Sequence, residues 1–134
     1  MPLFERIMDT NRSFMRLPLW VRLWIVLALG GVNLGAFLLT HTPTGYWAAW
    51  CTVLVLVMNS PILLVQRGWG KALAIPHLVV WIPLLGFVAF HLGADDITST
   101  ELYYALALFT VNGTSIVFDL VDSWRWLQGE RDVA

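Results

Sequence analysis

Apolar residues gather in four long runs, which occupy positions 19–39, 46–66, 72–92 and 102–123. Each run is about 20 residues long, which is what a helix needs to cross about 30 Å of hydrocarbon. A segment in hydrocarbon must satisfy its own backbone hydrogen bonds, so it is helical unless it belongs to a closed barrel. Barrel strands alternate in polarity, whereas the stretch 52–58 shows no alternation. The pattern therefore predicts four transmembrane helices.

The connections between these runs are short and occupy positions 40–45, 67–71 and 93–101. Short connections make consecutive helices run antiparallel as neighbours. We therefore expect an all-α integral membrane protein, an up-down bundle of four transmembrane helices that forms a single domain over residues 1–134.

The segment before the first run is amphipathic, with charged side chains set between apolar ones. It predicts a short helix that lies in the inner headgroup region and ends at Pro18. A partly ordered lead-in is the alternative. The apolar side chains that recur near helical spacing are Leu3, Phe4, Ile7, Met8, Phe14 and Met15.

Composition and charge strengthen the membrane interpretation. Hydrophobic residues make up 58% of the chain and charged residues 13%, against about 45–50% and about 25% in soluble domains. All eight Lys and Arg residues precede or open the first run, lie at the loop 67–71 or follow the fourth run. Because basic residues are retained on the cytoplasmic side, we expect a multi-pass protein of the cell (inner) membrane with both termini in the cytoplasm.

Polar residues in the fourth run fall on one helical face, within an arc of roughly 80°. They are Asn112, Ser115, Asp119 and Asp122. Such a face points into a bundle or toward a partner rather than toward lipid. One interpretation is a proton or cation site with Asp119 as its ionisable group. The interpretation that we favour is a structural ion pair between Asp119 and Arg22, which lies at similar depth in the first run.

Further candidates lie in the other runs. Asn33 and Asn59 are expected to join helices through amide hydrogen bonds. Pro61, which follows Asn59 and Ser60, predicts a kink, with local bonds from these two side chains. Gly31 and Gly35 form a small-xxx-small face that permits close helix approach, either within the chain or with another copy.

His77 and His91 lie fourteen residues apart in the third run. This spacing resembles the two-haem helices of cytochrome b proteins, which also need paired histidines on a second helix. Only His41 remains, in an outer loop, so the partner positions are missing. As alternatives to haem ligation, His77 is expected to be a polar residue near the inner interface and His91 an outer interfacial anchor.

The chain shows no metal-ligand spacing, phosphate-binding loop or nucleophilic serine elbow, and its single cysteine, Cys51, permits no disulfide within the chain. We expect no enzymatic activity, metal, cofactor or nucleic-acid partner. The leading hypothesis is a helix-packing subunit that contacts the bilayer and either itself or another membrane protein. The alternatives are a small channel or transporter with a polar pathway at Asp119, Asn112 and Asn59, and a b-haem electron carrier.

Overall fold

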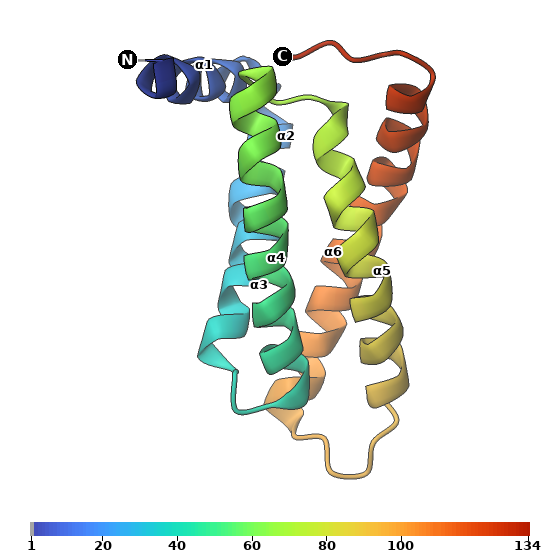
Figure 1. Ribbon diagram of the computed structural model, residues 1–134. Coiled ribbons are helices and arrows are strands. Elements are labelled where there is room, and N and C mark those ends of the chain that lie inside the picture. Colours follow the sequence, from blue (N-terminus) through green and yellow to red (C-terminus); the bar gives the residue numbers. More distant parts are fainter. Residues whose placement is uncertain (1) are drawn as a thin grey trace.

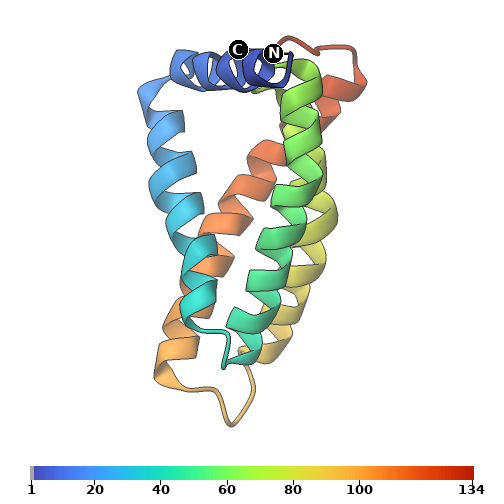
Figure 2. The same ribbon diagram turned by 60° about the vertical axis from the view of Figure 1, so that its left-hand side comes forward.

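The computed structural model describes residues 2–134, which are mostly helical and contain no strand. Within this part of the chain, four helices are long and apolar enough to cross a membrane: Leu19–Leu38, Pro43–Gln66, Lys71–His91 and Ser99–Leu127. The prediction of four long apolar helices is confirmed. In Figures 1 and 2 these helices lie alongside one another, with their connections at alternating ends.

The first long helix is composite, whereas the others are more regular. It consists of α2 (Leu19–Leu23), the π-helical segment η1 (Trp24–Gly30), α3 (Gly31–Gly35) and the 3-10 turn η2 (Ala36–Leu38). The other three long helices are α4 (Pro43–Gln66), the 3-10 turn η3 (Lys71–Leu73) with α5 (Ala74–His91), and α6 (Ser99–Leu127).

Two of the helices begin three residues before the predicted positions because threonines cap them. The Thr42 hydroxyl accepts a hydrogen bond from the Gly45 amide at 3.1 Å, and Pro43 occupies the first turn of α4. Thr98 caps α6 in the same way, accepting from the Glu101 amide at 3.2 Å. A cap satisfies an amide that lacks a partner within the helix, so it sets where each helix starts.

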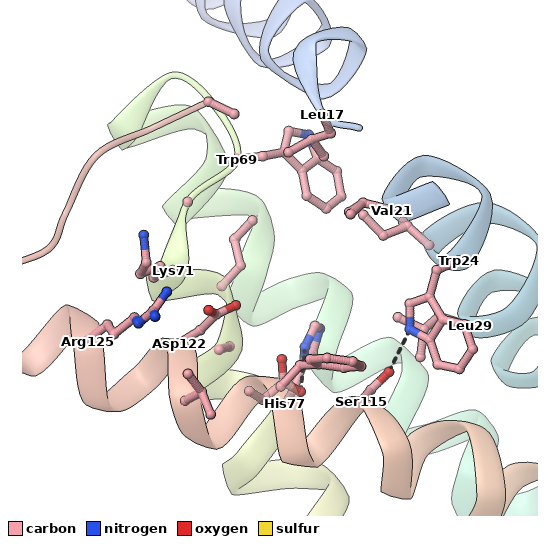
Figure 3. A pocket seen from close by; sticks show the side chains of 18 of the residues that line it. Leu17, Val21, Trp24, Leu29, Trp69, Lys71, His77, Ser115, Asp122 and Arg125 are labelled. Carbon is pink, nitrogen blue, oxygen red and sulfur yellow. Dashed lines mark hydrogen bonds and ion pairs between the residues drawn. The ribbon is translucent and has the colours of Figure 1, made fainter. Parts of the chain in front are cut away.

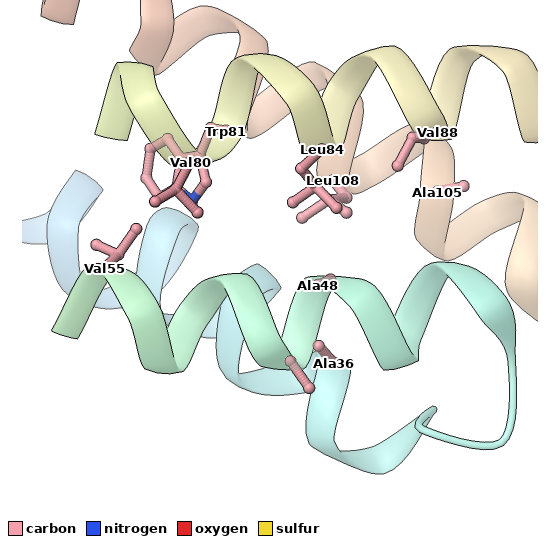
Figure 4. Packing of buried hydrophobic residues seen from close by; sticks show 10 residues of the cluster. Ala36, Ala48, Val55, Val80, Trp81, Leu84, Val88, Ala105 and Leu108 are labelled. Atoms are coloured by element: carbon pink, nitrogen blue, oxygen red, sulfur yellow. The ribbon is translucent and has the colours of Figure 1, made fainter. Parts of the chain in front are cut away.

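The hydrophobic core lies where α5 packs against both α4 and α6, next to α3 and η2 (Figure 4). Ala36, Ala48 and Ala105 are fully buried and bring the helices close together, because a methyl group adds little bulk. Val88 and Leu108 fill the remaining space and are also fully buried. These residues fill the interior of the bundle in the half near the connections 39–42 and 92–98.

The first long helix is the least enclosed of the four. Only 11% of its most apolar stretch is buried within the chain, against 44% for the helix Lys71–His91. In Figure 2 it leans away from α6 toward the end of the molecule that carries α1. The opposite end is therefore closed, whereas the α1 end is more open.

Helix α1 (Pro2–Arg16) crosses this more open end (Figures 1 and 2). Arg6 donates to the Leu64 carbonyl at 2.9 Å and Thr10 donates to the Leu63 carbonyl at 3.2 Å. Both carbonyls belong to the last turn of α4, and that of Leu63 also accepts from the amides of Arg67 and Gly68. The prediction of a helix that stops before Pro18 is confirmed, and α1 also serves as a cap for α4.

Candidate functional site

A polar cluster joins three helices at the α1 end of the bundle. The side chains are Asn59 of α4, His77 of α5 and Asp119 of α6. Nδ2 of Asn59 lies 3.1 Å from Nε2 of His77, and Nδ1 of His77 lies 3.3 Å from Oδ2 of Asp119. Trp81, one turn further along α5, stacks on the imidazole with ring centroids 4.3 Å apart. The ring therefore contacts Asn59 at one nitrogen, faces Asp119 with the other and stacks on Trp81.

The contacts of this cluster leave the Asp119 carboxylate with no Lys or Arg of residues 2–134 within 4 Å. Its nearest described partner is the imidazole of His77, and Asp119 is 9% exposed. An amide nitrogen is a donor, so the contact with Asn59 fits the His77 tautomer in which Nε2 accepts and Nδ1, which faces Asp119, carries the proton.

The predicted ion pair between Arg22 and Asp119 is wrong. Arg22 donates from Nε to the Leu17 carbonyl at 3.2 Å, and its Nη1 lies 3.8 Å from the sulfur of Met15. Its side chain therefore lies at the junction between α1 and α2, in contact with Leu17 and Met15. Because the first long helix leans away from α6 here, similar depth does not bring the two charges together.

Asn33 and Asn112 form a reciprocal amide pair at the centre of the bundle. Nδ2 of Asn33 donates to Oδ1 of Asn112 at 2.9 Å, and Nδ2 of Asn112 donates to Oδ1 of Asn33 at 3.0 Å. Both residues are buried, at 6% and 0% exposure. Asn33 also donates to the Leu29 carbonyl, and Thr52 donates to the Asn33 carbonyl. These bonds tie α3, α4 and α6 together.

A cavity of about 760 Å³ lies on the α1 side of the amide pair, between the first long helix, α5 and α6 (Figure 3). Trp24 and Ser115 lie at its wall, where the indole Nε1 donates to the hydroxyl at 2.9 Å. His77 and Asp119 also line the cavity. Three of the four residues of the predicted polar face, Ser115, Asp119 and Asp122, therefore border this space, and the fourth, Asn112, lies in the amide pair.

Asp122 lies at the side of the cavity with Lys71 and Arg125, as Figure 3 shows. The two cations lie near the carboxylate without an ion pair within 4 Å, and Arg125 approaches Glu130 at 3.9 Å. At this rim of the cavity, negatively and positively charged side chains therefore lie close together.

A second buried carboxylate occupies the other end of the bundle. Oε1 of Glu101 lies 2.9 Å from Nε2 of His91 and accepts a hydrogen bond from the Thr44 amide at 3.1 Å. Glu101 is 3% exposed. It holds the ends of α4, α5 and α6 together. The spacing of Thr98 and Glu101 is that of a capping box, which indicates the start of α6 but not the contacts of Glu101 with Thr44 and His91.

The glycine face predicted at Gly31 and Gly35 makes no close helix contact within residues 2–134. A Cβ at Gly31 would meet no atom of residues 2–134 within 4 Å, and one at Gly35 would meet only a Tyr104 ring carbon at 3.8 Å. The glycines with tight surroundings are Gly45, against the Leu39 backbone, and Gly68, against Ser13 and Val133.

Pro61 lies inside α4, which continues through it as one helix to Gln66. Ser60 donates to the Leu56 carbonyl at 2.6 Å, which is the local bond that the sequence predicts. Asn59 does not bond locally and instead reaches His77. The proline therefore lies next to the polar cluster.

Both histidines that are considered as haem ligands, His77 and His91, contact other side chains of the bundle. Each nitrogen of His77 faces a partner, and Nε2 of His91 faces Glu101. Among residues 2–134, no group of three or more His, Cys, Asp or Glu side chains is placed to hold a metal ion.

Comparison with known proteins gives no match: no family model, curated protein or solved structure resembles the chain.

Proposed function

We propose that the chain is an integral membrane protein in which the four long helices form an up-down transmembrane bundle. The apolar character and length of these helices support insertion. The basic residues support an orientation in the cell (inner) membrane with both termini and the loop 67–71 in the cytoplasm. Helix α1 then lies at the cytoplasmic interface, which fits its exposed apolar residues Leu3, Phe4 and Ile7.

Within that membrane, the proposed function is that of a helix-packing subunit of a homo-oligomer or of a larger complex. The observation that carries this proposal is the closed centre of the bundle. The amide pair of Asn33 and Asn112 is followed, on the outer side, by packed alanine, valine and leucine side chains. Polar groups used in this way join helices rather than line a hydrated route. The sparse burial of the first long helix supports assembly through that helix.

Purification in mild detergent with mass determination tests this proposal. The wild type is expected as an oligomer or with a stoichiometric membrane partner. Gly31→Ile should disturb the assembly if the first helix forms the interface, because the new side chain projects from an open surface. Gly86→Ile is the matched control, since a Cβ there also meets no atom of residues 2–134 within 4 Å. A monomeric wild type without a partner would contradict the subunit role.

A small transporter is the second candidate, and the cavity beside Asp119 favours it. An ionisable group that borders a cavity near one membrane face is suited to binding a solute or a proton. Packed side chains fill the half of the bundle opposite α1, so the cavity has no open route across the membrane. Such a protein would therefore work as a carrier, with a rearrangement of the first long helix, rather than as an open channel. A pH-dependent flux in liposomes that is lost in Asp119→Asn would support this candidate. Absence of flux in the wild type would remove it.

A further inference from the structure

The cavity at the α1 end has the size and walls of a small-molecule site. Its volume, about 760 Å³, lies within the range of about 300–1,000 Å³ that is typical of ligand pockets. Four aromatic side chains line it from both sides, from the first long helix (Trp20, Trp24), from the loop before α5 (Trp69) and from α6 (Phe118). Such walls suit a ligand with a broad apolar body.

The charges that border the cavity favour a ligand of positive sign. Its lining contains three carboxylates, Asp119, Asp122 and Asp132, against two permanent cations, Lys71 and Arg125. Both cations lie with Asp122 at the rim (Figure 3). Asp119 is different because its nearest described partner is the imidazole of His77, and no Lys or Arg of residues 2–134 lies within 4 Å of its carboxylate.

A buried carboxylate without a compensating cation is costly in a low-dielectric environment. A ligand cation that enters beside Asp119 would offset this cost, and indole faces add attraction to a positive charge. An anionic lipid headgroup would instead have to approach Asp119 and Asp122 with charge of the same sign. We propose that the cavity binds a lipophilic organic cation, an amine or quaternary onium ion with apolar substituents, with Asp119 as its counter-charge.

Two ions of nearly identical shape and opposite charge test the proposal. Tetraphenylphosphonium and tetraphenylborate are titrated against the purified wild-type protein by equilibrium dialysis in detergent. The phosphonium is expected to bind at least tenfold more tightly than the borate. Asp119→Asn should weaken phosphonium binding by roughly tenfold or more, because it removes the charge and keeps the shape. Asp96→Asn, in the exposed outer loop, is the matched control and should bind as the wild type does.

A second pair of variants keeps the test independent of any folding defect in Asp119→Asn. Val21 lines the cavity, so Val21→Trp should fill part of it and weaken binding while Asp119 stays in place. Val26, on η1, does not line the cavity and is 55% exposed, so Val26→Trp should leave binding unchanged. Equal binding of the two ions, an unchanged affinity in Asp119→Asn, or equal behaviour of the two tryptophan variants would overturn the proposal. None of these results depends on oligomeric state, so the subunit role is tested separately.

Discussion

The amide pair at the centre of the bundle gives a quantitative test of how the helices are joined. Hydrogen bonds between membrane helices contribute about 0.6 kcal/mol on average and up to about 2 kcal/mol each. Asn33 and Asn112 exchange two such bonds in a buried position. We therefore expect a coupling free energy of about 1–2 kcal/mol between the two residues.

The two single changes are expected to differ. Asn112→Leu leaves Asn33 with its second bond, to the Leu29 carbonyl. Asn33→Leu removes the only described partners of both amide atoms of Asn112, which is fully buried. Asn112→Leu should therefore cost about 1–2 kcal/mol and Asn33→Leu about 2–3 kcal/mol, because an unsatisfied buried amide retains its desolvation cost. The double leucine variant should be more stable than the sum of the two losses predicts.

Reversible unfolding in mixed detergent micelles, followed by tryptophan fluorescence, measures these free energies. Thr114→Val is a suitable control, since Thr114 is exposed on the same helix and donates only to the Thr110 carbonyl of α6. It should change the free energy of unfolding by less than about 0.5 kcal/mol. Additive losses in the two asparagine variants would refute the claim that the pair joins α3 to α6.

Three further predictions follow from the other contacts. His77→Gln and Asp119→Asn should show non-additive effects on the free energy of unfolding, with a coupling of about 0.5–2 kcal/mol in a double-variant cycle, whereas additive effects would mean that the two side chains act independently. Gly45→Ala should cost more than about 2 kcal/mol because its Cβ would meet the backbone of the preceding turn, and Gly31→Ala should be nearly neutral in the same denaturation assay. Glu101→Gln should lower thermal stability in detergent by removing the negative charge that holds three helix ends, and an unchanged melting temperature would exclude that role.

The long helices are predictable from the sequence because hydropathy directly reports which segments are apolar over a membrane-spanning length. Helix starts are less predictable for a definable reason. Thr42, Pro43 and Thr98 are neutral or polar and add nothing to an apolar run, yet their side chains and backbone set where α4 and α6 begin. An expectation based on capping chemistry as well as hydropathy recovers both starts.

The polar partners are less accessible to sequence reasoning than the helices. Helical periodicity places Asp119 on a polar face of the fourth run, but it does not say which helix lies opposite. Similar depth in the membrane suggests Arg22 as the partner of Asp119. In the structure the partner is His77, and Arg22 donates to the Leu17 carbonyl instead. The difference arises because short connections fix only consecutive neighbours, and the lean of the first long helix is a property of the packed bundle.

Cysteine accessibility in intact cells tests the central claim, that four helices cross the membrane with α1 on the cytoplasmic side. Cys51 is replaced by alanine, and single cysteines are placed in the loops 40–42, 67–70 and 93–98. A membrane-impermeant maleimide should label the first and third loops from outside, and the second loop only after the cells are broken. Labelling of the loop 67–70 in intact cells, or equal protection of all three loops, would contradict the proposed topology.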